Sequence, residues 1–137
     1  MIKKITLGIT LFFSTLMFAS PAYADWVEVA KGVDGDTFYV DFDRMRTNGS
    51  YVYYWQLSDF LEPINYGVLS DKVYNQVDCN MFRYKKLSKS YFKQPMGEGV
   101  IFLSDSNPNP EWVYPPPNSV AEIILKGVCE VAAIRDL

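Results

Sequence analysis

The chain carries two cysteines, Cys79 and Cys129, and contains no histidine among its 137 residues. A cysteine can serve as a nucleophile, as a metal ligand or as half of a disulfide. Catalytic sites of the Ser/His/Asp and Cys/His kinds are excluded, because no imidazole is present to act as general base. The two cysteines therefore constrain the fold chiefly through the elements on which they lie.

The first residues read MIKKITLGITLFFSTLMFASPAYADW. Lys3 and Lys4 precede an apolar run over 5–19, and the small-residue pattern AYA follows. This order is typical of a secretory signal peptide, and we expect cleavage after Ala24. A membrane anchor is less favoured, because the apolar run is shorter than the roughly 20 residues of a spanning helix. No cysteine near the cleavage site could take a lipid, so we expect an exported protein without a lipid anchor or membrane span, in the periplasm or at the cell surface.

The remaining residues, 25–137, form a single domain of 113 residues, which is the full chain of 137 less the leader of 24. This length suffices for one core but not for two. Loss of the two leader lysines leaves 11 basic side chains against 16 acidic ones, a net charge of −5. Nucleic acid is excluded as a partner by this charge, because its phosphates require a basic footprint on the protein.

Alternating apolar residues predict about six strands. Residues 26–30 and 37–40 read as a hairpin across the turn sequence KGVDGD, residues 41–46 as a helical turn, and Asn48-Gly49 as a tight turn. Further strands are predicted over 51–60, 69–79, 82–92 and 100–103, with a break or bulge at Asn80. In the strand 51–60, alternation assigns Tyr51, Tyr53, Trp55 and Leu57 to the core and Val52, Tyr54, Gln56 and Ser58 to the outward face.

The C-terminal segment is predicted to cover this sheet, since an antiparallel sheet must bury its apolar face. The stretch SDSNPNPEWVYPPPNS, residues 104–119, is too rich in proline for sheet or helix. Ser119 and Glu122 then form a capping box at a helix start. Apolar residues recur at helical spacing from there, namely Val120, Ile123, Ile124, Val128 and Val131. The expected fold class is α+β: a single antiparallel sheet of about six strands covered by a C-terminal helix.

The two cysteines can now be placed on elements. Cys79 lies on a predicted sheet strand, Cys129 lies on the covering helix, and the leader sends both to an oxidising compartment. We interpret the pair as a disulfide that tethers helix to sheet. Closing a loop of about 50 residues should stabilise the fold by about 4 kcal/mol on the loop-entropy estimate. A catalytic thiol is the rival interpretation.

No other motif indicates an enzyme. The chain has no phosphate-binding glycine loop and no dinucleotide fingerprint. The stretch DGDTFYVDFD, residues 34–43, gathers four aspartates but lacks EF-hand spacing, which favours solvated turn acids over a calcium site. We therefore expect a protein that is not an enzyme and holds no metal or cofactor. A small hydrolase would require a pocket with two acids of raised pKa.

A basic stripe and two tyrosines are the candidate binding residues. Four cations share one parity of the strand 82–92 and its continuation: Arg83, Lys85, Lys89 and Lys93. They could meet an acidic partner or a heparin-like polymer. A solvated face or a protected sheet edge is the alternative, and a bulge would scatter the stripe. Tyr54, on the outward parity, and Tyr114, beside the prolines, could serve a partner or a dimer interface, with ordinary partial burial as the alternative.

Ordered landmarks run along the whole mature chain. They are Trp26, FYVD at 38–41, YYWQLSDF at 53–60, DC at 78–79, YF at 91–92 followed by PMGEG at 95–99, Trp112 before Pro117 and Ser119, and VC at 128–129. In this order and with both cysteines placed, the sequence resembles the surface-adhesin protein E family of Gram-negative bacteria.

The resemblance implies an antiparallel sheet with a C-terminal helix tethered by a Cys79–Cys129 bridge, and it implies homodimerisation. It also implies an adhesin that binds host extracellular proteins, including plasminogen, vitronectin and laminin. The family's namesake is lipid-anchored in the outer membrane, whereas this sequence lacks the anchoring cysteine. A periplasmic accessory protein that binds an envelope component and has no host contact is therefore the alternative function.

Overall fold

The computed structural model describes residues 24–106 and 109–135. The predicted leader, residues 1–24, lies outside the described residues except for Ala24, so its cleavage stays a prediction. The elements within the described ranges are β1 (Val27–Lys31), β2 (Thr37–Asn48), β3 (Tyr51–Ile64), the 3-10 turn η1 (Asn65–Gly67), β4 (Val68–Asp78), β5 (Arg83–Phe92), the 3-10 turn η2 (Pro95–Gly97), β6 (Leu103–Asp105), β7 (Asn109–Val113) and α2 (Val120–Arg135).

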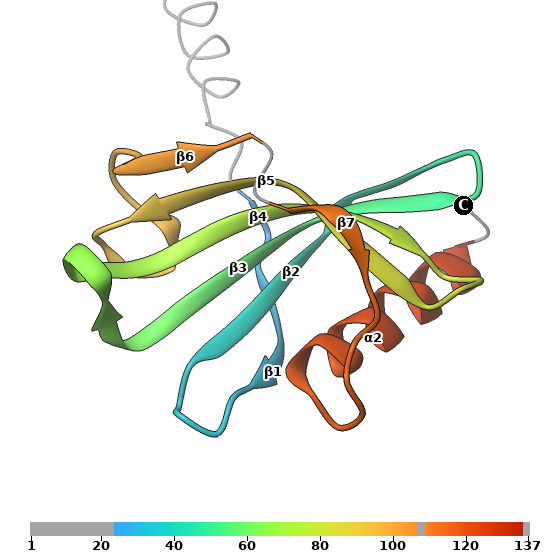
Figure 1. Ribbon diagram of the computed structural model, residues 1–137, viewed down its shortest axis with the longest axis horizontal. Coiled ribbons are helices and arrows are strands. Elements are labelled where there is room, and N and C mark those ends of the chain that lie inside the picture. Colours follow the sequence, from blue (N-terminus) through green and yellow to red (C-terminus); the bar gives the residue numbers. More distant parts are fainter. Residues whose placement is uncertain (1–23, 107–108, 136–137) are drawn as a thin grey trace, which may run out of the picture.

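All seven of these strands belong to one antiparallel sheet. The order is β1-β2-β3-β4-β5-β6, and β7 pairs with β5 beside β6. Figure 1 shows β2 to β5 as long neighbouring strands, with α2 in red beside one part of the sheet. The predicted α+β class is therefore confirmed, and the strand count exceeds the prediction by one.

The additional strand, β7, lies in the segment that was predicted to be too rich in proline for a sheet. That prediction holds for residues 114–119 but is wrong for β7, an edge strand that pairs with β5 through Tyr84↔Val113 and Lys86↔Asn109. An edge strand tolerates proline, since a backbone N–H that points away from the neighbouring strand is not needed for pairing. The segment therefore adds Trp112 to the sheet.

The predicted helical turn over 41–46 is also wrong. This stretch belongs to β2, whose pairing with β3 shifts register between Asp41 and Arg46. Such a bulge allows a strand to continue past residues that do not fit its regular alternation. The predicted turn at Asn48-Gly49 is confirmed: β2 ends at Asn48, and Gly49 has the positive φ of 65° that glycine adopts without strain.

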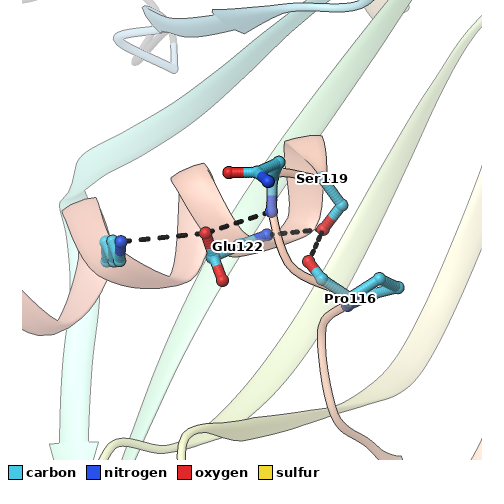
Figure 2. A network of polar contacts seen from close by, with 5 residues as sticks. Pro116, Ser119 and Glu122 are labelled. Carbon is cyan, nitrogen blue, oxygen red and sulfur yellow. Dashed lines mark hydrogen bonds and ion pairs between the residues drawn. The ribbon is translucent and has the colours of Figure 1, made fainter.

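The start of α2 is fixed by side-chain capping (Figure 2). The Ser119 hydroxyl accepts a hydrogen bond of 3.1 Å from the Glu122 backbone N–H, and it donates one of 2.6 Å to the Pro116 carbonyl. The Glu122 carboxylate accepts from the backbone N–H of Asn118 at 3.3 Å, not from that of Ser119 as a strict capping box requires. Ser119 and Glu122 therefore begin the helix as predicted, with the reciprocal bond one residue earlier.

The core lies between α2 and one face of the sheet. Its buried residues are Val40, Met45, Val52, Tyr54, Val77, Ile124, Leu125 and Val128. Ile123, predicted to face the sheet, is instead 48% exposed, and Leu125 takes a core position. Val52 and Tyr54 on β3 face the helix, so the predicted core parity is wrong for the part of the strand that α2 covers. Leu57, which was also predicted to be a core residue, is 0% exposed, but it is buried on the opposite face, beside Gly97 of η2. Both faces of β3 carry aromatic residues, and alternation alone could not tell which face the helix would cover.

The disulfide between Cys79 and Cys129 is present, with a Cα–Cα distance of 5.8 Å. Cys79 directly follows β4, and Cys129 lies within α2. Both cysteines pack against the core cluster. The bridge thus tethers the helix to the sheet as predicted, and the rival interpretation of a catalytic thiol is excluded.

Candidate functional site

The face of the sheet opposite α2 carries a row of aromatic side chains. Tyr51, Tyr53 and Trp55 project from β3, Tyr74 from β4 and Trp112 from β7. The Trp55 and Tyr74 rings have centroids 4.8 Å apart, those of Tyr53 and Tyr74 are 6.1 Å apart, and those of Tyr51 and Trp112 are 5.5 Å apart. All five side chains are half-buried. Within the described ranges α2 is the only α-helix, and it covers the other face.

Five cationic side chains accompany this aromatic row, and together the ten residues define the open face. The cations are Arg44, Arg46, Lys72, Arg83 and Lys85.

At one end of the open face, the Trp112 ring contacts two cations. The Arg83 guanidinium and the Lys85 ammonium are each 4.5 Å from the centroid of its ring. Arg83 is held in place by Asp78, whose carboxylate accepts from the guanidinium at 3.1 Å. A cation over an indole ring is attracted by the negative face of the π system. Arg83 and Lys85 are thus positioned with part of their hydration already removed.

The centre of the open face is organised by the Tyr74 hydroxyl. It accepts hydrogen bonds from Arg46 Nη2 at 2.9 Å and from Arg46 Nε at 3.2 Å. The Tyr53 hydroxyl accepts from the Gln76 side-chain amide at 3.1 Å. Arg46, Tyr53 and Tyr74 line a shallow hollow together with Thr47 and Asn48. The bulge in β2 places Arg46 opposite Tyr53, so the guanidinium reaches across to β4.

The other end of the open face is a second hollow, lined by Trp26, Asp41, Arg44, Trp55 and Lys72. Asp41 is buried and its carboxylate lies 3.3 Å from Arg44 Nε. Burial, and the neighbouring Arg44 guanidinium, lower the pKa of Lys72. Lys72 also lies 4.9 Å from the centroid of the Phe92 ring. This end therefore presents two cations against one buried acid.

The predicted basic stripe is divided by a bulge in β5. The pairing of β4 with β5 shifts between Tyr74↔Ser88 and Asn75↔Lys86, which leaves Leu87 as the additional residue. Arg83 and Lys85, before the bulge, contact Trp112 on the open face. Lys89, after it, pairs with Asp71 at 3.4 Å on the helix-covered face. The prediction that these cations share one face is therefore wrong, because an extra residue reverses the alternation.

The structure places the other three candidate binding residues at three separate positions. Lys93 is 4.4 Å from the centroid of the Phe102 ring, beyond the end of β5. Tyr54 is 1% exposed in the core, so it is not available to a partner, contrary to the prediction. Tyr114 is 57% exposed and lies beside Arg83 at the edge of the open face. Of the six candidates, Arg83, Lys85 and Tyr114 are therefore brought together.

Several residues of the open face were not singled out in the sequence. Tyr74 shares its parity with Lys72 and Gln76, and this alternation was a usable signal for one common face. Trp112 gave no such signal, because its edge strand β7 lies in a proline-rich segment that was not predicted to be a strand. The face offers ring surfaces together with ammonium and guanidinium groups. Such groups can bind acidic groups without covalent chemistry.

The sequence pattern of the family described as "Surface-adhesin protein E" matches residues 26–130. The chain belongs to the surface-adhesin protein E family. The matched region includes both cysteines and all ten residues of the open face. No curated protein matches the chain. Among the residues that the structure describes, no helix is long and apolar enough to cross a membrane.

Solved structures of Haemophilus influenzae protein E share the fold of this member of the surface-adhesin protein E family. One has a TM-score of 0.59 at 11% sequence identity, over 80% of this chain and 87% of that chain. A structure of protein E from non-typeable Haemophilus influenzae has a TM-score of 0.53 at 13% identity, over 85% of this chain and 91% of that chain. At these identities the likeness concerns the fold alone.

Proposed function

We propose that this protein is a non-enzymatic, exported binding protein of the adhesin type, which holds an acidic partner on its open face. The observation that carries the proposal is the gathering of Arg44, Arg46, Lys72, Arg83 and Lys85 on one aromatic sheet face. Membership of the surface-adhesin protein E family supports binding as the general function.

The electrostatics of the chain favour an acidic partner for this face. The predicted mature chain has a net charge of about −5, from 11 basic and 16 acidic side chains, yet five of the basic ones line the open face. Two of these, Arg44 and Arg83, pair with Asp41 and Asp78, and the other cations leave the face positive. A local positive face on an acidic protein orients an acidic partner as it approaches. The half-buried rings add apolar area at a small cost in conformational entropy. The open face therefore combines orientation with contact area.

For the partner we propose a host extracellular matrix protein or plasminogen, with contact through its acidic segments. Immobilised mature protein should bind plasminogen, vitronectin or laminin in biolayer interferometry, and the affinity should fall as salt is raised, because the charges are exposed to solvent.

Homodimerisation stays a prediction, which light scattering of the mature protein would check.

Charge reversal tests the open face directly. Arg46→Glu combined with Lys85→Glu should weaken partner binding at least about tenfold, which corresponds to about 1.4 kcal/mol. Lys126 lies on the far side of the sheet, on the exposed side of α2, and Lys126→Glu and Lys31→Glu together make the same change in net charge. This control variant should bind like the wild type. Equal loss in both variants, or in neither, would contradict the assignment of the open face.

The compartment decides which partners the protein meets. Protease applied to intact cells should remove the protein if it is exposed at the outer surface, while a periplasmic marker survives. Protection until the outer membrane is opened would contradict a host partner. It would favour the alternative function, in which a periplasmic accessory protein uses the same face for an acidic envelope component.

A further inference from the structure

The helix-covered side of the sheet contains a cavity of about 390 Å³. It exists because α2 packs mainly against β1 and β3 and leaves the β4–β5 part of this face partly uncovered. Its walls are apolar and include Phe38, Phe60 and Ile64 from the sheet and Val120, Ile124 and Leu125 from the helix. Tyr84 and Tyr91 at its margin are half-buried, so the cavity reaches the surface. The volume is at the small end of the range for small-molecule sites.

The floor of this cavity is polar, unlike its walls. Cross-strand pairing places Ser58 beside Asp71 and Asn75 beside Lys86. Ser58, Asp71 and Asn75 are each less than 10% exposed, with 6%, 3% and 2% of their surface accessible. The Asn75 amide makes only a long bond of 3.5 Å to the Val73 carbonyl. A bound acceptor group could give this buried amide a better partner than the Val73 carbonyl.

The charges in the cavity do not balance. Asp71 is the one carboxylate among the lining residues, and its Oδ2 lies 3.4 Å from Lys89 Nζ. Its Oδ1 is buried and has no hydrogen-bond partner among the described residues. Lys86 makes no ion pair or hydrogen bond within residues 24–106 and 109–135. The lining therefore holds two ammonium groups against one carboxylate, a surplus of one positive charge.

Two alternative uses of the cavity are less consistent with these groups. Hydrolysis by a carboxylate pair is not supported, because the lining contains a single acid. If the cavity had only a structural role, the Lys86 ammonium would be more stable in solvent than at the cavity lining. Burial, and next the neighbouring Lys89, lower the pKa of Lys86. An anion bound beside Lys86 would stabilise the charged ammonium and so oppose both effects.

We propose that this cavity is a binding site for a small amphipathic monoanion, a carboxylate with an apolar body. The carboxylate meets the ammonium of Lys86 and the amide of Asn75, and the body lies against the apolar walls. A single negative charge matches the surplus positive charge of the lining. The site is on the opposite side of the sheet from the open face and does not depend on the proposed function.

The test uses 8-anilinonaphthalene-1-sulfonate, an aromatic monoanion whose fluorescence rises in an apolar site, bound to the mature protein. Decanoate should displace the probe, and decanol, which has the same chain length without the charge, should displace it at least about tenfold less well. Lys86→Met should remove this preference for decanoate. Decanoate should also raise the melting temperature of the wild type but not of the variant, because a ligand stabilises the state that binds it.

The neighbouring residue provides the matched control. Lys85→Met removes the same charge from the same strand, but on the open face, and should leave decanoate displacement unchanged. Conversely, Lys86→Met should leave the protein partner's affinity unchanged, so the two proposals can fail separately. If Lys86→Met does not fold, Ala121→Phe, which fills the cavity from the helix, should abolish probe binding. Equal displacement by decanoate and decanol, or no saturable displacement, would overturn the site.

Discussion

At the scale of single residues, Tyr54 decides which face of β3 is the core. Its ring is 1% exposed, and its hydroxyl donates to the Gln56 side-chain carbonyl at 3.2 Å. Tyr53, its neighbour, is half-buried on the open face and accepts from Gln76. Two adjacent tyrosines thus have opposite roles, one in packing and the other on a surface.

This contrast predicts different stabilities for two otherwise equal truncations. Tyr54→Ala should lower the free energy of unfolding by about 3–5 kcal/mol, because it leaves a cavity in the core. Tyr53→Ala should cost clearly less, since much of its ring contact is at the surface. Tyr54→Phe, which removes only the hydroxyl, should cost about 1 kcal/mol. Urea unfolding of the three variants measures this order, and equal costs for the two alanine variants would contradict the assignment of the faces.

At the scale of elements, the β4–β5 hairpin depends on Asp78. Its carboxylate accepts from the Met81 backbone N–H at 3.1 Å and from Arg83 Nε at 3.1 Å, which closes the turn after β4. The sequence predicted this break near Asn80 and both flanking strands. The bulge at Leu87 was not located, because a single extra residue has no compositional signature in a strand of mixed lysines and serines.

The Asp78 contacts predict a pH dependence for the hairpin. The Met81 N–H and the Arg83 guanidinium lower the pKa of Asp78, against an opposing effect of burial. A carboxylate with a lowered folded-state pKa contributes stability above its unfolded value of about 3.9, and this stability is lost as the pH falls through the folded value. Asp78→Asn should therefore melt below the wild type at pH 7 and pH 5. The difference should shrink as the pH falls below about 3.9.

Thermal unfolding followed by circular dichroism measures that difference. Asp34→Asn supplies a control, because it removes one exposed carboxylate from the turn between β1 and β2, away from the β4–β5 hairpin. A gap between wild type and Asp78→Asn that persists unchanged at pH 2 would argue that the asparagine variant is destabilised for another reason.

At the scale of the whole molecule, the Cys79–Cys129 bridge connects the end of β4 to α2 across 50 residues of sequence. The closed loop contains β5, β6 and β7, including the strand that carries Trp112. The bridge therefore limits how far the helix and the β5 edge can separate in the unfolded chain.

Cys129→Ser should lower the free energy of unfolding by about 4 kcal/mol on the loop-entropy estimate for this separation. It should also leave Cys79 reactive toward a thiol reagent after unfolding. The double variant Cys79→Ser with Cys129→Ser should cost about the same as the single one, because both remove one bond. A melting curve of Cys129→Ser that matches the wild type would contradict a stabilising tether.

The sequence by itself determined the α+β class, the main strands, the start of the helix at Ser119 and the disulfide. Each of these follows from local periodicity, from capping residues or from the presence of only two cysteines. The tertiary structure decided which face of β3 the helix covers, the pairing of β7 at an edge and the division of the basic stripe at Leu87. Those features depend on pairing register and on packing between distant segments, and such long-range choices leave little trace in local sequence.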